Sequence, residues 1–306
     1  MKPQTIALAG VGDLGRYFCD ELSQDVRYSV IVLTRQKNRF ISSKVKTCTT
    51  DYSEDSVVSI LNETGATALI SLIQCPDEDY LSLHNNILNA CLRSNDCKRF
   101  IPSEWAGNIE EFPDIPPAYG KTRAPFREIL RKTRGIQWTL FNQGWFMEYF
   151  VSEEKSYMKY LPGEFPINPI DWHYCVRGTG DEPQSWTCGR DVAKAVAELL
   201  AADEWEPVTY VAGTSGTFNW AAELLEKFYG RPLTRSYRSI NDINNDLQRN
   251  LPEKELLVVE AELWTITGAT ACPRQKAERQ REKFFSELHL MTIEELLESA
   301  EKNGQV

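Results

Sequence analysis

A glycine-rich loop stands near the start of the chain, directly after a short apolar run. The run covers residues 5–9, and the loop reads Gly10-Val11-Gly12-Asp13-Leu14-Gly15, which contains the pattern G-x-G-x-x-G. Amphipathic helical spacing follows without a gap. A strand, a glycine turn and a helix in this order predict a cradle for a dinucleotide pyrophosphate at the helix N-terminus. We expect the binding residues to be Gly10, Gly12, Leu14 and Gly15; a glycine turn without a ligand is the alternative.

Strand and helix patterns alternate through the first half of the chain. Apolar runs predict strands over residues 5–9, 28–33, 46–49, 68–73, 99–101 and 138–141. Amphipathic stretches between them predict helices over residues 13–22, 53–64, 81–92 and 117–133. This alternation predicts an α/β fold with a Rossmann-type, doubly wound parallel sheet and right-handed crossovers.

The pattern loosens after residue 145. Residues 151–190 are rich in aromatic residues, prolines and glycines; predicted helices over 190–201 and 219–228, a strand over 208–211 and a charged, mostly helical stretch over 240–301 follow. We therefore expect a cofactor-binding Rossmann domain over residues 1–150 and a smaller, mostly helical substrate-binding lobe over residues 151–306. Some later segments, such as 190–212, are expected to pack back on the sheet.

The residues after the second predicted strand bear on the choice between NAD and NADP. An acidic residue at this point would bind the ribose 2′-hydroxyl of NAD. This chain instead has Thr34 and Arg35, with Lys37 two residues further on. A guanidinium forms charge-assisted bidentate contacts with a phosphate, so Arg35, helped by Thr34, predicts NADP(H) as the cofactor. For Lys37 alone, a solvated loop is the preferred interpretation.

Two further residues follow predicted strands and are expected at the same edge of the sheet. Asp51 comes after the third strand and is expected at the adenine edge, although a loop cap fits nearly as well. Gln74 comes after the fourth strand and is expected on the ribose side of the cofactor. Both expectations follow from the rule that parallel strands present ligand-binding groups at their carboxyl ends.

Charge and residue content disfavour several classes of partner. The formal net charge is −10 over 306 residues, which repels a phosphate backbone and disfavours nucleic-acid binding. No run reaches the roughly 18 consecutive apolar residues of a membrane span, and we expect no cleavable signal peptide. The 8 cysteines lack a C-x-x-C pair and suit a reducing compartment, and no histidine or carboxylate cluster has metal spacing. We expect a cytoplasmic monomer or homodimer that takes a small-molecule substrate and no metal.

The catalytic pattern typical of short-chain dehydrogenases is missing. No tyrosine has a lysine four residues on, so the tyrosine-acid mechanism is not encoded in its Y-x-x-x-K form. The corresponding region holds the segment Phe100-Ile101-Pro102-Ser103-Glu104-Trp105. A second segment, Tyr119-Gly120-Lys121-Thr122-Arg123, follows at the predicted helix over 117–133.

The first of these segments closely resembles the strand-five motif of the NmrA-like atypical short-chain dehydrogenases, in particular of the isoflavone and phenylcoumaran benzylic ether reductases. Leu33-Thr34-Arg35 and the aromatic segment Gly144-Trp145-Phe146-Met147-Glu148-Tyr149-Phe150 are also similar to patterns of this family. The resemblance covers roughly residues 5–200. The chain departs from the family at Ala9 and Val11, where glycine and threonine are frequent; both residues are compatible with a turn. Beyond residue 200 the likeness is loose, which leaves the substrate open.

The resemblance implies an NADP(H)-dependent reductase whose catalytic residue is a lysine on the helix after this motif. Lys121 matches that lysine, with Arg123, Phe126 and Arg127 at helical offsets. A positively charged nicotinamide and Arg123 would disfavour the ammonium form of a neighbouring lysine, which favours proton transfer. Lys121 also fits a role in holding the nicotinamide ribose, and a solvated lysine is the plain alternative.

Other candidate site residues are weighed against packing roles. His173 is the one histidine retained as an acid–base candidate, ranked below Lys121, whereas His84 in an apolar helix is interpreted as structural. Ser103 is expected to line the site, and Glu104 either lines it or caps a helix. A pocket for a flat, aromatic or alkaloid-like substrate is expected, with core packing as the alternative, from the residues Trp145, Phe146, Tyr149, Trp172 and Tyr174.

Three functions are compatible with the sequence. The first is an NADP(H)-dependent reductase of a specialised metabolite that reduces an enone, an imine or a benzylic ether, with Lys121 as acid or base. The second is a non-redox enzyme, such as a cyclase, that keeps bound NADP(H). The third is a nucleotide-sensing regulator like NmrA itself, which has no need of Lys121.

Overall fold

The computed structural model describes residues 2–36, 45–75 and 79–306, and the chain divides into two units. Unit 1 comprises Met1–Trp105, Gly120–Phe141 and Ala193–Thr209, and unit 2 comprises Ala106–Tyr119, Asn142–Val192 and Tyr210–Val306. Neither unit is a continuous stretch, so no single cut at residue 150 separates them. The assignment of cofactor binding to residues 1–150 and substrate binding to residues 151–306 stays a prediction.

Unit 1 is built on a six-stranded parallel sheet with the order β3-β2-β1-β4-β5-β6. Its strands are β1 Gln4–Ala9, β2 Tyr28–Thr34, β3 Lys46–Thr49, β4 Ala66–Ser71, β5 Arg99–Ile101 and β6 Gln137–Trp138. β1 ends in four consecutive buried residues, Ile6 to Ala9, because helices cover both faces of a parallel sheet and leave no side for polar residues. The strand order reverses between β1 and β4, which confirms the predicted Rossmann-type doubly wound fold.

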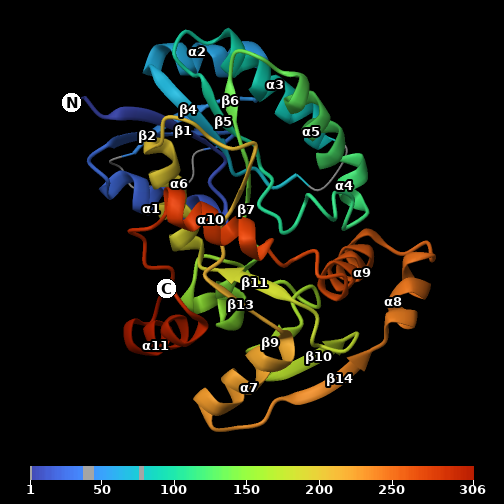
Figure 1. The fold of residues 1–306 in the computed structure, drawn as a ribbon. Coiled ribbons are helices and arrows are strands. Elements are labelled where there is room, and N and C mark those ends of the chain that lie inside the picture. Colours follow the sequence, from blue (N-terminus) through green and yellow to red (C-terminus); the bar gives the residue numbers. More distant parts are fainter. Residues whose placement is uncertain (1, 37–44, 76–78) are drawn as a thin grey trace. The chain divides into compact units, whose positions relative to one another are not determined.

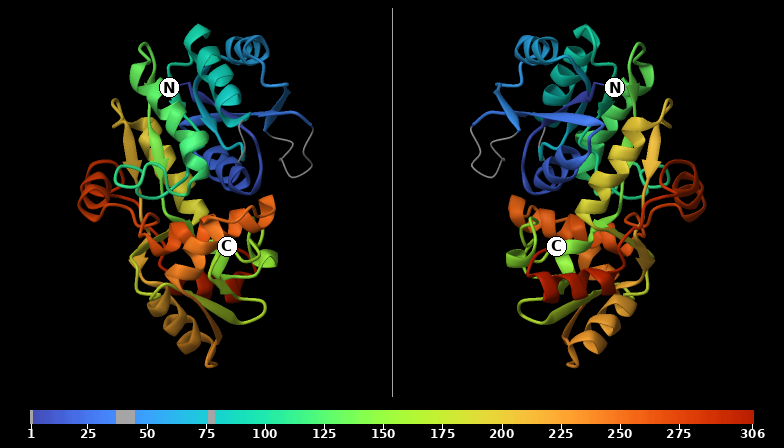
Figure 2. Two further views of the ribbon diagram at one scale, coloured as in Figure 1. Left: turned by 90° about the vertical axis from the view of Figure 1, so that its right-hand side faces the viewer. Right: turned by 90° about the vertical axis from the view of Figure 1, so that its left-hand side faces the viewer.

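Helices cover both faces of this sheet. α2 (Glu54–Thr64), α3 (Asp79–Arg93) and α5 (Arg123–Lys132) lie side by side on one face, and α1 (Asp13–Gln24) lies on the other (Figure 1). Right-handed crossovers require this split. α1 leads from β1 toward the β3 edge of the sheet, whereas α2, α3 and α5 lead toward the β6 edge, so these helices must cover the opposite face. The same helices can be followed in blue to green in both views of Figure 2.

The end of α6 (Gly189–Ala201) joins unit 1 through the start of β2. The hydroxyl of Tyr28 donates a hydrogen bond to the main-chain oxygen of Ala197 at 2.6 Å. Arg27 forms an ion pair with Glu198 at 2.6 Å. These contacts explain why a segment so late in the chain groups with the first sheet.

The helix expected over residues 117–133 is interrupted. The structure has a short α4 (Ala118–Lys121) and a separate α5, and Thr122 between them has φ −109° and ψ −72°. Pro125 accounts for the break, because in a continuous helix its ring would collide with the carbonyl of Lys121 and it has no N–H to donate. Lys121 therefore ends a short helix instead of opening a long one.

Unit 2 holds small sheets and the late helices. One sheet has the order β14-β10-β9 and another the order β13-β11-β8. β7 (Leu140–Asn142) pairs with β12 (Val208–Tyr210), and most of both strands belongs to unit 1. The segment 151–190, which lacks sequence periodicity, contributes strands whose partners lie far along the chain; β10 runs parallel to β14, for example. The bounds of the remaining elements are β8 Trp145–Phe146, η1 Met147–Phe150, η2 Glu153–Lys155, β9 Ile167–Asn168, β10 His173–Arg177, β11 Gln184–Thr187, β13 Thr214–Gly216, α7 Phe218–Tyr229, β14 Thr234–Arg238, α8 Ile240–Leu247, α9 Glu253–Ile266, α10 Arg274–Phe284 and α11 Ile293–Asn303.

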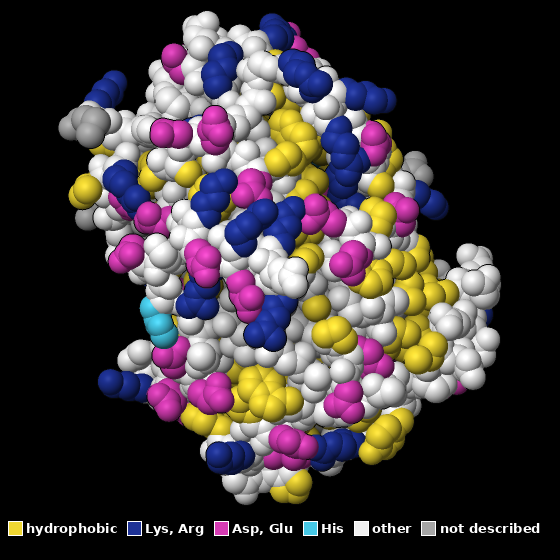
Figure 3. Space-filling view, in the orientation of Figure 1, with side chains coloured by type: hydrophobic (Ala, Val, Ile, Leu, Met, Phe, Trp, Pro, Cys, Tyr) yellow, Lys and Arg dark blue, Asp and Glu magenta, His cyan; other side chains and the backbone are white. Residues whose placement is uncertain are grey.

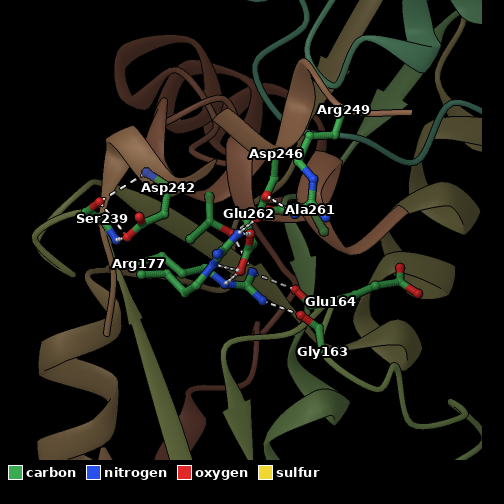
Figure 4. Close-up of polar contacts among 11 residues, drawn as sticks. Gly163, Glu164, Arg177, Ser239, Asp242, Asp246, Arg249, Ala261 and Glu262 are labelled. Carbon is green, nitrogen blue, oxygen red and sulfur yellow. Dashed lines mark hydrogen bonds and ion pairs between the residues drawn. The ribbon is translucent and has the colours of Figure 1, made fainter. Parts of the chain in front are cut away.

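A network of charged side chains ties α8 and α9 to β10 and β14 (Figure 4). The buried guanidinium of Arg177 donates to the main-chain oxygens of Glu164, at 2.7 Å, and of Gly163. Glu262 accepts two hydrogen bonds from Arg238, at 2.8 and 3.1 Å, and lies 4.0 Å from Nε of Arg177. Burial lowers the pKa of Arg177, and the carboxylate of Glu262 opposes that shift. Arg177 and Glu262 can therefore be buried together without leaving an isolated charge.

The surface carries charges of both signs. Figure 3 shows Lys and Arg side chains interleaved with Asp and Glu side chains over one face of the described residues. Within the described part of the chain, no helix is long and apolar enough to cross a membrane.

The loop after β5 is anchored to α5 by a buried ion pair. The side chains of Glu104 and Arg127 are 1% and 2% exposed, and Arg127 donates from Nη2 and Nε to the two carboxylate oxygens at 2.6 and 3.1 Å. Nε of Arg123 lies 3.9 Å from the same carboxylate. The bidentate geometry gives each buried charge an opposite partner. This pairing across to α5 is the role of Glu104 in the structure, in place of the expected helix cap.

Replacing Arg127 tests this anchor. Arg127→Met removes the guanidinium but keeps an apolar side chain, so Glu104 stays buried with only Arg123 nearby. We expect the free energy of unfolding to fall by about 3 kcal/mol, as is typical when one partner of a buried pair is removed. Urea denaturation followed by circular dichroism measures the change. The double variant Glu104→Gln/Arg127→Met should recover part of the loss, whereas an Arg127→Met protein as stable as the parent would contradict the anchoring role.

Candidate functional site

The loop and strand-end residues predicted to bind the cofactor lie together at one edge of unit 1. Gly10–Gly15 follow β1, Thr34 ends β2, and Arg35 follows it. Asp51 comes after β3, and Gln74 comes after β4. This is the carboxyl edge of the parallel strands, and the point where the strand order reverses is where open α/β sheets bind ligands.

The glycine loop has the geometry of a close turn with an open outer side. Gly10 has φ +86°, and a Cβ there would lie 2.9 Å from Cγ1 and 3.3 Å from Cα of Ile73. A Cβ at Gly15 would lie 3.0 Å from the oxygen of Gly10. A Cβ at Gly12, the N-cap of α1, would meet nothing within 4 Å. The first and third glycines are thus required by packing, whereas the space at Gly12 is open to a ligand at the positive end of a helix dipole.

The turn after β2 presents Arg35 at the edge of the sheet. The hydroxyl of Thr34 donates to the main-chain oxygen of Gln36 at 2.8 Å and shapes this turn. Arg35 is exposed, and its Cζ lies 5.6 Å from the ring centroid of Tyr52. Lys37 lies outside the described residues. A guanidinium that stacks on a ring keeps its N–H groups available in the plane of the fork.

The two other strand-end residues differ in their surroundings. Oδ1 of Asp51 accepts hydrogen bonds from the hydroxyl of Ser53 at 2.7 Å and from its N–H at 2.9 Å. These bonds, that of the Ser53 hydroxyl above all, lower the pKa of the Asp51 carboxyl. Asp51 thus caps its own loop, which is the alternative that the sequence offered. Its contact with an adenine stays a prediction. Gln74 is exposed.

His84 is a buried junction beneath this edge. Its Nε2 lies 3.0 Å from the hydroxyl oxygen of Ser71 and accepts the N–H of Ser103 at 3.4 Å. Nδ1 therefore carries the proton and donates to the main-chain oxygen of Tyr80 at 2.9 Å. Burial lowers the pKa of His84 to about 4, so the ring is neutral at physiological pH. His84 joins β4, α3 and the loop after β5, as expected of a structural histidine.

Ser103 belongs to the same buried layer. It is 5% exposed, and its main-chain oxygen accepts the hydroxyl of Tyr80 at 3.1 Å. Trp105 follows with φ +44°, and its indole N–H donates to the main-chain oxygen of Ser71 at 3.0 Å. These bonds hold the loop after β5 against β4. Ser103 is thus placed at the expected edge, but with little of its surface accessible to a substrate.

Lys121 belongs to unit 1 and is exposed. Two residues further on, Cζ of Arg123 lies 5.0 Å from the ring centroid of Tyr80, and its Nε lies 3.9 Å from Glu104. The chain at this point is therefore held beside the loop after β5. The structure assigns the Lys121 ammonium no hydrogen bond or ion pair with the residues that it describes. Such an ammonium group is available to a ligand.

The aromatic residues expected near the substrate belong to unit 2, and several of them pack in its core. Trp145 is 5% exposed, and its ring centroid lies 4.7 Å from that of Trp264 and 5.4 Å from that of Phe165. Phe146 and Tyr149 are partly exposed and in edge-to-face contact. Burial favours the packing alternative for Trp145. Substrate contact stays a prediction for Phe146 and Tyr149.

The other expected residues of unit 2 lie at the start of β10, with Trp172 directly before the strand. Trp172 and Tyr174 are buried; the indole N–H of Trp172 donates to the main-chain oxygen of Pro232, and the hydroxyl of Tyr174 donates to Oδ1 of Asn219. Both residues belong to the core cluster, so burial favours packing for them too. His173 lies between them in β10, is partly exposed, and pairs with β9 and β14. Its acid–base role stays a prediction.

A cavity of about 620 Å³ lies within unit 2. Its walls come from segments far apart in the sequence, which is why no local pattern predicts it; they include Ser185, Ser215, Cys272, Arg274, Glu278 and Arg281. The five aromatic residues expected to bind the substrate are not among its lining residues. Among the residues that the structure describes, no group of three or more His, Cys, Asp or Glu side chains is placed to hold a metal ion.

Glu148 supplies a helix cap that the sequence did not reveal. It is buried, and its Oε1 accepts the N–H of Gly189 at 2.6 Å and the thiol of Cys188 at 3.3 Å. This carboxylate satisfies the N-terminus of α6, where a negative charge is favourable. Burial raises the pKa of Glu148 to about 7. A lone glutamate inside an aromatic segment was the one available sign of a buried polar contact.

Comparison with known proteins places this geometry in a family. No family model matches the chain. The oxidoreductase swnR of Arthroderma benhamiae is 36% identical to it over 293 residues, which cover 95% of each protein. The oxidoreductase swnR of Metarhizium robertsii is 34% identical over 286 residues, which cover 92% of each.

Solved structures share the fold over nearly the whole chain. The binary complex of leucoanthocyanidin reductase with NADPH from Vitis vinifera has a TM-score of 0.73 at 16% identity, over 97% of this chain and 100% of that one. An isoflavone reductase has a TM-score of 0.73 at 16% identity, over 96% and 98% of the two chains. At these identities the likeness establishes the fold, and the kinship rests on the swnR relatives and the β5 motif. The chain belongs to the family of the swnR oxidoreductases, and it has the fold of the isoflavone and leucoanthocyanidin reductases.

Proposed function

We propose that this oxidoreductase is an NADP(H)-dependent reductase of a small aromatic or alkaloid-like metabolite, in which an enone, an imine or a benzylic ether is reduced. One observation carries the proposal: an open glycine cradle and an exposed arginine stand at the ends of two adjacent strands, β1 and β2. The relatives named oxidoreductases and the solved NADPH complex of the same fold support the cofactor and the reaction class.

The residues at this edge fit a dinucleotide that carries a 2′-phosphate. The open space at Gly12 admits a pyrophosphate, and the N-terminus of α1 favours its negative charge. Arg35 is exposed at the place where NAD enzymes have an acidic residue. Its fork of donors matches phosphate oxygens, which favours NADP(H) over NAD(H).

The reduction needs a proton as well as a hydride. When bound, NADPH supplies the hydride. Nζ of Lys121 is the proton source in this proposal, and the lysine is reprotonated from solvent. In an enone or an imine the hydride and the proton add across the double bond. In a benzylic ether the hydride adds to the benzylic carbon, the C–O bond breaks, and the released oxygen takes the proton. The exposure of Lys121 allows that exchange, whereas His84 is buried, neutral and engaged at both ring nitrogens.

Gly12→Val tests the cradle. The added side chain meets no protein atom within 4 Å of its Cβ, so the fold should survive. It occupies the space assigned to the pyrophosphate, so NADPH binding should be lost. Calorimetric titration measures binding, and circular dichroism measures the fold; Gly12→Ala provides the smaller step. Undiminished NADPH binding by the valine variant would mean that the loop does not hold phosphates.

Arg35→Ala tests the choice of cofactor. Loss of a charge-assisted bidentate contact should weaken NADPH binding by about ten- to a hundredfold, while NADH binding changes little. Arg93→Ala is the matched control. Arg93 is also an exposed arginine of unit 1, but it stands at the end of α3 and forms an ion pair with Glu54. Fluorescence titration with both cofactors gives the affinities. Equal affinity of the parent protein for NADPH and NADH would contradict the assignment of Arg35 to the 2′-phosphate.

Lys121→Ala tests the proton source. We expect the rate to fall by about 10²–10⁴-fold, the usual contribution of general acid–base catalysis, with NADPH binding retained. Lys121→Arg should not restore the rate, because arginine does not release a proton at neutral pH. Lys132→Ala, at the exposed end of α5, is the control.

The assay follows nicotinamide absorbance and product together, with flat aromatic enones and imines as substrates. Near-normal turnover by Lys121→Ala would refute the assignment and direct attention to His173. Product formed without loss of NADPH would contradict the reductase and favour a non-redox enzyme.

A further inference from the structure

Tyr52 has an unusual backbone conformation beside the proposed cofactor site. It follows β3 with φ +62°, in the left-handed region that bulky residues rarely adopt, and it is 4% exposed. Its N–H donates to the hydroxyl oxygen of Thr50 at 3.0 Å. Thr50 is in turn held by its own N–H, which donates to the main-chain oxygen of Thr34 at 3.0 Å. The strained conformation is thus maintained by bonds to the end of β2, as is common at functional positions.

The hydroxyl of Tyr52 reaches the glycine loop through a shared acceptor. It donates to the main-chain oxygen of Leu33 at 2.7 Å. The same oxygen accepts the N–H of Gly10 at 3.0 Å. Tyr52 therefore fixes its ring against the very carbonyl that holds the first glycine of the loop.

The ring of Tyr52 lies against Arg35. Cζ of Arg35 is 5.6 Å from the ring centroid, within the range of a cation–π contact. An exposed arginine side chain otherwise samples many rotamers, and ordering it on ligand binding costs conformational entropy. A guanidinium already stacked on a fixed ring loses less entropy when it meets a phosphate.

We propose that Tyr52 is a specificity-determining positioning residue: its ring pre-orients Arg35 for the 2′-phosphate and thereby sets the preference for NADP(H) over NAD(H). This inference rests on the proposed function, in which Arg35 binds that phosphate. Tyr52 itself acts through Arg35, which lies against its ring. The effect of Tyr52 should therefore be confined to ligands that carry the 2′-phosphate.

The test compares variants of the full chain by titration with NADPH, NADH, 2′,5′-ADP and 5′-ADP. Tyr52→Leu removes the ring and should weaken NADPH and 2′,5′-ADP binding by about three- to tenfold, the size of a partly exposed cation–π contact, with NADH and 5′-ADP changed less than about twofold. Tyr52→Phe keeps the ring and should keep the preference for NADPH. Tyr52→Met is a second ringless variant in case the leucine variant does not fold.

Tyr28, the first residue of β2, offers a matched control. It is also buried, its hydroxyl also donates to a main-chain oxygen, and Cζ of Arg27 lies 5.3 Å from its ring centroid. It stands at the amino end of β2, away from the carboxyl end that Arg35 follows. Tyr28→Leu should therefore alter stability without changing the ratio of NADPH to NADH affinity.

A double variant separates this inference from the function on which it rests. In an Arg35→Ala background, Tyr52→Leu should have no further effect on NADPH affinity. If Arg35→Ala leaves NADPH binding intact, the proposed cofactor site fails. If Arg35→Ala weakens it but the ringless variants at Tyr52 do not, or weaken NADPH and NADH equally, only the role of Tyr52 is overturned. Loss of the preference in Tyr52→Phe would also overturn it.

Discussion

The turn at Gly10 is the constraint on which the carboxyl edge of unit 1 depends. Gly10 has φ +86°, and a Cβ at this position would lie 2.9 Å from Cγ1 of Ile73. Only glycine fits both conditions. Because β1 and β4 are direct neighbours, this turn must pass the chain after β4 at close range before α1 begins. The carbonyl of Leu33 then fixes the turn from the other side, since it accepts both the Gly10 N–H and the Tyr52 hydroxyl. Three strand ends are thereby held around one glycine, and Arg35 takes its position from them.

The features predicted correctly from sequence are those whose physical cause is local. Apolar runs between amphipathic helices indicated the parallel sheet, because strands buried on both faces have no other pattern. The break at Thr122 was also encoded locally, by Pro125, but the helical spacing around it concealed the signal. The pairing of β10 with β14 had no local cause, since α6, α7 and three further strands intervene and a parallel partner can stand at any distance along the chain.

The site was predictable only in part, for a related reason. The glycine loop and Arg35 could be placed at the carboxyl edge of the sheet because each follows the end of a strand, and their contact with the cofactor stays a prediction. Tyr52 gave no signal in the sequence, since its importance arises from a left-handed backbone and a ring that meets Arg35 from another strand. Aromatic content predicts a pocket and a core equally well, and burial favours the core alternative at Trp145, Trp172 and Tyr174.

The charged residues of the motif regions are of two kinds, buried carboxylates that hold loops in place and an exposed lysine. Glu104 and Glu148 sit in the segments that resemble the family, yet each is buried and engaged, one with Arg127 and one with the start of α6. A buried carboxylate held in this way stabilises a loop and cannot exchange protons readily with solvent. Lys121 has the opposite character: it is exposed, and Arg123 holds the adjoining chain in place through Glu104 and Tyr80. In the proposed reductase, an exposed lysine on an anchored segment would combine a fixed position with access to solvent, which is what such an enzyme requires of its acid.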